Sequence, residues 1–195
     1  QSRSWLPDPV GGIIWFGVDD TFYTVYTPMY CGMSSVPHSF AVGNGDIMTY
    51  SDDAAFWVFN EVTNFVYSRA NVMTPDLQAK QKELEQKYLK ETAEIDARAA
   101  ELFKSTAKGA AKKGTELITS YSVNAGDNTV REWRELYKHL FTKYMDGNVK
   151  TRRPLPEGYK YVAPDVKQPG YPQDWLMRIV IDAGDKLKMP DGAGH

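Results

Sequence analysis

The sequence has few of the residues that build disulfides, metal cages or anion-binding surfaces. Its 195 residues include one cysteine, Cys31, which can form neither an intramolecular disulfide nor a thiolate zinc cage. Basic residues number 23 against 25 acidic ones, so no excess positive charge is available to bind a phosphate backbone. The longest apolar stretches, such as residues 11–18, fall far short of the roughly 20 residues that cross a bilayer. We therefore expect no nucleic-acid partner and no membrane span.

The overall composition is that of a folded protein. Hydrophobic residues make up 42% and charged residues 25% of the chain. A chain of this length buries on the order of 70% of its unfolded surface, so it needs no covalent or metal staple. The distribution of aromatic, charged and proline residues predicts three parts: residues 1–72, 73–147 and 148–195.

Residues 1–72 are predicted to contain a sheet. The β-prone segments 13–18 and 22–27 flank a turn at Asp19-Asp20-Thr21, which predicts a hairpin. Residues 13–16 are apolar on both faces, which indicates a strand covered on each side, as in a layered sandwich. Two further short strands are expected at 40–42 and 47–50.

Helices are expected from about residue 54 onward. The first, to about residue 70, is largely buried and takes its N-cap from Ser51-Asp52-Asp53. A second begins at Thr74-Pro75 and runs to about 108, with one narrow apolar stripe on an otherwise charged surface. The glycines of 109–114 and the segment 124–129 indicate breaks before a third and a fourth helix, the last ending near 145.

Residues 148–195 are rich in proline, glycine and tyrosine. This composition predicts an extended wrap over the surface, anchored by its tyrosines. Residues 176–181 indicate a terminal strand or docked edge, and the tail after Lys188 is expected to be mobile. The three parts together predict an α+β fold with a C-terminal helical region and an extended tail.

No residue pattern specifies a reaction by itself. Cys31, with His38 seven residues on, could be a nucleophile and base, but an inert thiol and a structural histidine are the favoured interpretation. The pairs Asp19-Asp20 and Asp52-Asp53 are better explained by a turn and a helix cap than by acid–base chemistry. No dinucleotide loop, phosphate loop or metal-ligand spacing occurs, so we expect no cofactor and no metal.

The first 70 residues resemble a known peptidase family. The opening block runs Arg3-Ser-Trp-Leu-Pro-Asp-Pro-Val-Gly-Gly-Ile-Ile-Trp-Phe-Gly-Val-Asp-Asp. Further matches follow in Tyr26-Thr-Pro-Met-Tyr30, in Pro37-His-Ser-Phe40 and in Ser51-Asp-Asp-Ala-Ala-Phe-Trp57. Their order and spacing resemble the middle of dipeptidases of peptidase family C69, the dipeptidase A type.

The resemblance implies an N-terminal-nucleophile (Ntn) hydrolase, whose fold is an αββα sandwich of two sheets between helical layers. Such an enzyme attacks with a cysteine at the first position of the mature chain, where the α-amino group acts as base. This chain starts with Gln1, and Cys31 does not occupy the nucleophile's position. We therefore expect the C-terminal part of a cysteine dipeptidase, inactive alone, whose nucleophile lies in a missing N-terminal part.

The resemblance also implies partners and one site residue. The substrate is a dipeptide, and the missing N-terminal part is a partner; a homo-oligomer is compatible with the sequence. Arg3 is the one candidate catalytic residue, because related amide hydrolases place an arginine near the nucleophile, and a structural arginine is the alternative. A start without methionine favours an extracytoplasmic (periplasmic or secreted) location over a cytoplasmic one. The competing function is a non-enzymatic interaction module that uses the helices of residues 75–146.

Overall fold

The computed structural model describes residues 1–188. The chain falls into two compact units, Gln1–Phe141 and Thr142–His195. Helices combine with two small antiparallel sheets, which agrees with the predicted α+β class. The predicted domain division at residues 72 and 147 stays a prediction.

Unit 1 starts with short elements that form a small sheet. Helix α1 (Asp8–Gly11) leads into strand β1 (Ile13–Phe16), which pairs antiparallel with β2 (Thr27–Tyr30). The register places Ile13 opposite Tyr30 and Phe16 opposite Thr27. A 3-10 turn, η1 (His38–Phe40), follows. All four residues of β2 are buried, because this strand lies between β1 and the helices.

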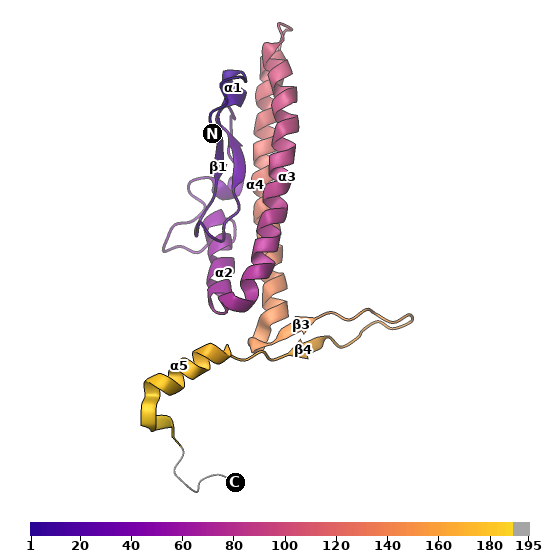
Figure 1. Ribbon diagram of the computed structural model, residues 1–195. Coiled ribbons are helices and arrows are strands. Elements are labelled where there is room, and N and C mark those ends of the chain that lie inside the picture. The colour runs from indigo at the N-terminus through magenta and orange to yellow at the C-terminus, as the bar shows by residue number, and fades with distance from the viewer. Residues whose placement is uncertain (189–195) are drawn as a thin grey trace. The chain divides into compact units, whose positions relative to one another are not determined.

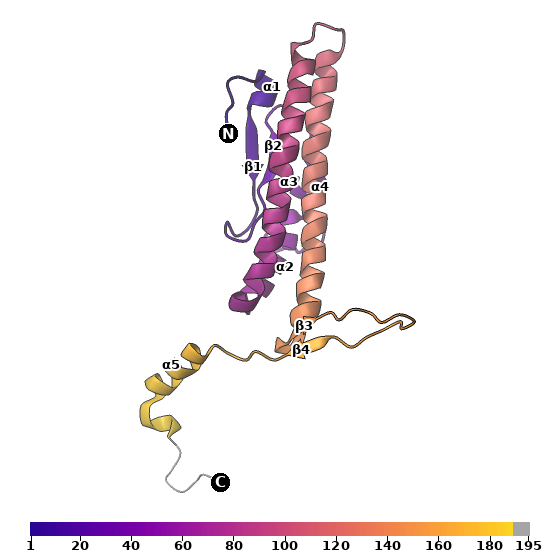
Figure 2. The ribbon, with the colours of Figure 1, turned by 45° about the vertical axis from the view of Figure 1, so that its right-hand side comes forward.

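Unit 1 also contains α2 (Ala55–Tyr67), α3 (Ala70–Lys104) and all but the last three residues of α4 (Ala110–Tyr144). Figures 1 and 2 show α3 and α4 running side by side as a helical hairpin, with the sheet and α2 on one flank. One part of the core joins the sheet to both long helices; its buried residues are Val10, Ile13, Tyr30, Ile95, Ala99 and Ile118. Burial of these side chains is the main force holding the sheet on the hairpin.

The predicted hairpin of segments 13–18 and 22–27 is wrong, because β1 pairs with β2 instead. Residues 22–26 form no strand, and α3 supplies hydrogen-bond partners for some of their backbone groups. The Gln81 amide donates to the Thr24 carbonyl at 2.6 Å, and Glu85 accepts the Tyr26 N–H at 3.1 Å. Side chains of a neighbouring helix thus satisfy backbone groups that the sequence pattern assigned to a sheet ladder.

Strand β1 is covered on one face only by the described residues. Ile14 is 53% exposed and Phe16 44% exposed, so the prediction of a strand covered on both sides is not met within this part of the chain. The strands predicted at 40–42 and 47–50 are also wrong. Phe40 ends η1, a turn with positive φ at Gly43 and Gly45 follows, and an isolated bridge between Asp46 and Thr49 encloses residues 47 and 48.

The predicted first helix is confirmed as α2, but its predicted cap is wrong. The N-cap residue is Ala54, which makes no side-chain capping bond, while the Ser51 hydroxyl accepts the N–H of Asp53. Helix α3 begins at Ala70, four residues earlier than predicted, and includes Pro75. The proline therefore lies inside the helix, where it removes one backbone donor, and does not mark its start.

The predicted breaks within α4 are wrong, because one helix runs from Ala110 to Tyr144. The glycines in it allow close packing. A Cβ on Gly114 would lie 2.7 Å from the Phe103 ring, and a Cβ on Gly126 would lie 2.7 Å from Pro37 Cβ. The chain turns only at Ser105–Gly109, where Gly109 has a φ of 81° that favours glycine.

Unit 2 contains regular elements, and the predicted wrap over the surface stays a prediction. It contains the 3-10 turn η2 (Met145–Gly147), the paired strands β3 (Val149–Thr151) and β4 (Asp165–Lys167), helix α5 (Gln173–Ala183) and the turn η3 (Gly184–Leu187). The terminal strand predicted at 176–181 is wrong, since these residues lie in α5, where Pro172 is the N-cap and Asp174 favours the helix N-terminus.

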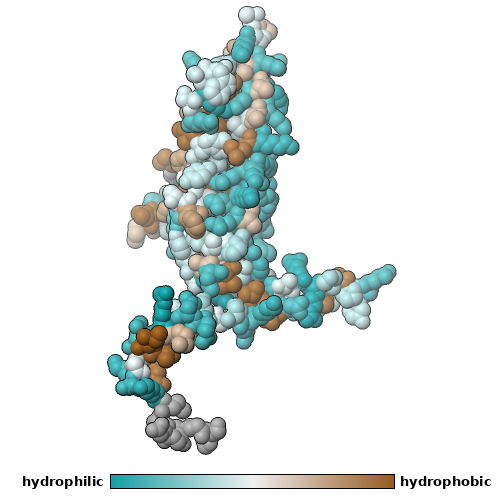
Figure 3. Space-filling model, in the orientation of Figure 1, coloured by the Kyte–Doolittle hydropathy of each residue, from teal (hydrophilic) through white to brown (hydrophobic). Residues whose placement is uncertain are grey.

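Several aromatic side chains of unit 2 are exposed. The tyrosines expected to anchor the segment, Tyr159, Tyr161 and Tyr171, are at least 67% exposed. Figure 3 shows apolar side chains gathered over α5, and none of the helix's residues is buried. The predicted mobile tail after Lys188 lies outside the described residues.

Candidate functional site

Arg3, the candidate that the sequence singled out, is buried at the start of unit 1 with 6% of its surface exposed. Its Nη1 forms an ion pair with Asp96 Oδ2 on α3. Its Nη2 donates to the Val10 carbonyl at 2.7 Å, and its guanidinium carbon lies 5.8 Å from the centre of the Tyr30 ring. Arg3 therefore joins the N-terminal segment, α1, β2 and α3.

Tyr30 completes this cluster from the last position of β2. Its hydroxyl donates to Asp96 Oδ1 at 2.6 Å, so one carboxylate accepts from both Arg3 and Tyr30. Burial, reinforced by the hydrogen bond to Asp96, holds the pKa of Tyr30 well above its usual range. The phenol is therefore a fixed neutral donor, not an acid that exchanges protons near neutral pH.

The polar contacts of Arg3 are those of a structural clamp. Both of its nitrogens that find partners bind groups of this same unit, and its buried Nε has none. The guanidinium also has little access to solvent. A direct catalytic role for Arg3 stays a prediction, whereas its connection to α3 is visible in the structure.

A chain of hydrogen bonds continues from this cluster between the long helices. The Tyr121 hydroxyl on α4 lies 3.2 Å from Thr92 Oγ1 and 3.3 Å from the Tyr88 carbonyl. The Tyr88 hydroxyl in turn lies 2.7 Å from Thr129 Oγ1, which is 3.1 Å from Thr27 Oγ1 on β2. These bonds fix the register of β2 against both helices.

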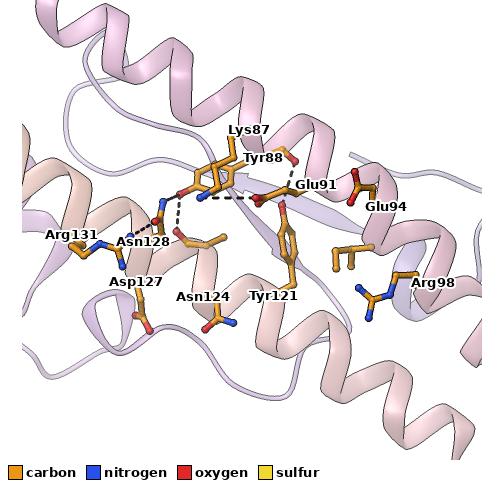
Figure 4. A pocket seen from close by; sticks show the side chains of 12 residues that line it. Lys87, Tyr88, Glu91, Glu94, Arg98, Tyr121, Asn124, Asp127, Asn128 and Arg131 are labelled. Atoms are coloured by element: carbon orange, nitrogen blue, oxygen red, sulfur yellow. Dashed lines mark hydrogen bonds and ion pairs between the residues drawn. The ribbon is translucent and has the colours of Figure 1, made fainter.

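On the outer side of the helical hairpin lies a groove of about 490 Å³. Figure 4 shows its charged side chains, which come from both helices. Its lining residues are Lys87, Tyr88, Glu91, Glu94, Ile95, Arg98, Tyr121, Asn124, Ala125, Asp127, Asn128 and Arg131. Both signs of charge are present, but the lining holds no cysteine, serine, threonine or histidine. The groove therefore lacks a peptidase-type nucleophile among the described residues.

Cys31 and His38 do not form a catalytic pair in the structure. Cys31 is exposed, directly after β2, and its N–H donates to the Gly12 carbonyl at 3.0 Å. His38 opens η1 with its carbonyl bound by the Ala41 N–H at 3.0 Å, and its ring is exposed. Within residues 1–188 the Cys31 thiol has no hydrogen-bond partner, so no base is positioned to activate it.

The acidic pairs have structural roles, as the sequence predicted for the first of them. Asp20 Oδ1 accepts the Phe22 N–H at 2.7 Å and closes the turn, in which Asp19 has a φ of 64°. Asp52 accepts the Tyr50 hydroxyl at 2.9 Å, a contact that a helix cap does not explain. Among residues 1–188 no group of three or more metal-ligating side chains is gathered, and no helix is long and apolar enough to span a membrane.

Asp96 is the residue that sequence reasoning missed. The sequence predicts only a charged surface around the apolar stripe of this helix, yet Asp96 binds both Arg3 and Tyr30. A signal was present in the spacing, because Asp96 follows Thr92 by four and Tyr88 by eight residues, which places all three along one side of α3. The contact with Arg3 had no such signal, because the two residues are 93 positions apart in the sequence.

Comparison with known proteins identifies the family of the N-terminal segment. The model of peptidase family C69 matches residues 1–83, which span the sheet, α2 and the first turns of α3. A search of curated proteins gives no match. The matched segment contains every residue block that carried the resemblance in the sequence. Residues 1–83 are thus similar to peptidase family C69.

Proposed function

We propose that this chain is part of a dipeptidase whose attacking thiol lies outside these 195 residues. The observation that carries the proposal is the family match over residues 1–83, which includes Arg3, the sheet and Cys31. The family match supports peptidase activity, and the resemblance of the opening block to dipeptidase A enzymes supports dipeptides as the substrate.

The environment of Cys31 supports a nucleophile elsewhere. A cysteine nucleophile needs a base or a positive neighbour to form the thiolate, and Cys31 has neither within hydrogen-bond distance. The attacking group would then come from a further part of the same protein. The uncovered face of strand β1, with Ile14 and Phe16 exposed, suits contact with a second sheet, as in an αββα sandwich.

The competing function, an interaction module built on residues 75–146, receives less support. The long helices already use their apolar stripes within unit 1: Leu77, Leu84 and Tyr88 of α3 are buried, as are Ile118 and Trp133 of α4. The remaining surface of the hairpin is mostly charged, which is typical of a solvated face.

A comparison of two proteins tests the proposal. The 195-residue chain and the product of the complete open reading frame that contains it are assayed on a panel of dipeptides. We expect turnover from the second alone, with loss of activity after alkylation and no loss in the Cys31→Ser variant. Hydrolysis by the pure 195-residue chain, abolished by Cys31→Ser, would show that the thiol was assigned wrongly.

A further inference from the structure

The groove between α3 and α4 is formed by two tyrosines that cross between the helices. Tyr88 of α3 reaches α4, where its hydroxyl donates to the Ala125 carbonyl at 3.0 Å and accepts from the Asn128 amide at 3.0 Å. Tyr121 of α4 reaches α3, where its hydroxyl donates to the Tyr88 carbonyl at 3.3 Å. Ala125 contributes only a methyl group to the lining, which leaves the seam between the helices open at this point. The shape of the groove is therefore set by hydrogen-bonded side chains.

One part of the groove offers a carboxylate. Glu91 of α3 is half-buried, and one of its oxygens lies 3.9 Å from Lys87 Nζ, near the upper limit for an ion pair. Burial raises the pKa of Tyr121 above its usual range, and the charge of Glu91 raises it further, which indicates that this carboxylate lies near the phenol. A carboxylate has about four lone-pair positions, so Glu91 can accept further hydrogen bonds.

The opposite part offers a guanidinium. Arg98 lies about two helical turns beyond Glu91 on α3, is exposed, and forms no ion pair or hydrogen bond within residues 1–188. Glu94, four residues before it, is placed where a helical ion pair is favoured, yet the two side chains do not pair. Figure 4 shows the Arg98 side chain extended along the groove toward Tyr121. Its N–H donors are therefore available to bind a carboxylate through two parallel hydrogen bonds.

We propose that this groove binds a free amino acid or a dipeptide as a zwitterion. Its carboxylate accepts from Arg98, its ammonium group donates to Glu91, and an apolar side chain packs on the Tyr121 ring. Opposite charges in one groove select a ligand that carries both, because a ligand with a single charge leaves one of the two groups without a partner. A ligand rich in phosphate would meet the carboxylates of Glu91, Glu94 and Asp127, which disfavour it.

The size and lining of the groove agree with such a ligand. Its 490 Å³ lie within the range of roughly 300–1,000 Å³ that small-molecule sites have, and Ile95 and Tyr121 supply apolar surface. The inference rests on the proposed function, since dipeptides and amino acids are the substrates and products of that reaction. The lining holds no peptidase-type nucleophile, so the ligand is not cleaved there. The groove is thus an effector site, separate from the site of hydrolysis.

Hydrogen bonds connect the groove to the sheet. The Tyr88 hydroxyl lies 2.7 Å from Thr129 Oγ1, which lies 3.1 Å from Thr27 Oγ1 in β2. A ligand that packs against the tyrosine pair therefore also stabilises the packing of β2 on the helices. Because such a ligand binds the folded protein and not the unfolded chain, the melting temperature should rise with its concentration.

The test is an amide NMR titration of the isotope-labelled 195-residue chain with leucine and, separately, with leucyl-leucine. We expect the Ala125 amide and the Asn124 side-chain amide to shift, with a dissociation constant on the order of millimolar, while the Val58 amide in α2 stays unchanged. The ligand that binds more tightly identifies the effector as product or substrate. N-acetyl-leucinamide, which carries neither charge, should shift neither groove signal.

Pairs of ligands and variants test each charged contact separately. N-acetyl-leucine lacks the ammonium group, so its binding should weaken about fivefold in Arg98→Gln and stay unchanged in Glu91→Gln. Leucinamide lacks the carboxylate and should show the reverse dependence. Lys90→Gln and Glu101→Gln, which remove exposed charges of α3 outside the groove, are the matched controls and should leave the binding of both ligands unchanged.

The proposal would be overturned by no shift at about 50 mM leucine or leucyl-leucine, or by equal shifts with N-acetyl-leucinamide. Binding that is lost in the product of the complete open reading frame would also overturn it, since the groove would then be occupied by the protein itself. Binding without any hydrolysis by that product would instead refute the proposed function and leave this inference intact. Hydrolysis without binding in the groove would do the opposite.

Discussion

The replacement of Asp96 by alanine is the sharpest test of the contacts that hold the N-terminal segment on α3. Asp96 has 15% of its side chain exposed and Arg3 has 7%, so the pair is largely removed from water. Removing one partner of such a pair leaves an uncompensated buried charge, which costs about 3–5 kcal/mol. The Tyr30 hydroxyl loses its acceptor in the same change, and because the two losses share one carboxylate they are not additive.

The expected result is a loss of about 3–5 kcal/mol in the free energy of unfolding, measured by urea denaturation. Asp96→Asn keeps an acceptor for Tyr30 and should cost less. Replacing both partners, in Arg3→Met with Asp96→Leu, should recover most of the loss because no charge is left unpaired. The control is Glu94→Ala, at an exposed position two residues before Asp96 on α3. Its free energy of unfolding should lie within about 0.5 kcal/mol of that of the parent protein.

Hydrogen exchange localises the effect. In Asp96→Ala the amides of Arg3 and Ile13, which bond to Gly11 and Gln1, should exchange faster than those at the centre of α4. A loss below 1 kcal/mol with unchanged exchange at these amides would refute the reasoning that Asp96 holds this segment in place.

Further predictions follow from other contacts. Gly126→Ala should destabilise unit 1 by about 1–3 kcal/mol because the new Cβ would collide with Pro37. The control, Asn124→Ala on the exposed side of α4, should change stability by less than about 0.5 kcal/mol, and thermal melts of both variants measure the difference. The pKa of Tyr30 is raised by burial and by Asp96, and that of Tyr121 is raised by burial, so their contribution to stability is complete below pH 10 and decreases as pH rises further. Absorbance at 295 nm should show that these two phenols ionise only when the protein unfolds. Ionisation of every tyrosine near pH 10 in the folded protein would contradict their burial. Brief trypsin digestion should cut first at Lys104 or Lys108, which flank the turn between α3 and α4, and a first cut at Arg69 would show that the α2–α3 junction is the weaker one. Cys31→Ser should alter stability by no more than about 1–2 kcal/mol, since the thiol is exposed and unbonded; a larger loss in a denaturant titration would show a contact that the structure lacks.

Local patterns predicted the helices better than the sheet. The apolar spacing of residues 55–67, and the apolar residues that recur every four or seven positions from Leu77 to Ile95, were sufficient to predict α2 and α3, because helical contacts are close in sequence. The partner of β1 was mispredicted, since residues 22–26 have strand-forming composition but take their hydrogen bonds from Gln81 and Glu85. These hydrogen bonds join residues more than 50 positions apart in the sequence, so a local sequence pattern cannot predict them.

Glycine was the second source of error. Gly114 and Gly126 were interpreted as helix breaks, whereas both lie inside α4 and allow Phe103 and Pro37 to approach. Sequence alone cannot separate a glycine that turns the chain from one that admits a neighbour, because the neighbour is distant in sequence. The same limit applies to Arg3, whose burial against Asp96 required the structure.

The most direct test of the central claim compares dipeptide hydrolysis by three proteins. These are the product of the complete open reading frame, its Cys31→Ser variant and the 195-residue chain, each assayed at equal concentration with folding verified by a cooperative melt. The account predicts equal turnover in the first two, within about twofold, and none in the third, because the thiol that attacks the peptide is not Cys31. Loss of turnover in Cys31→Ser at unchanged stability would contradict it.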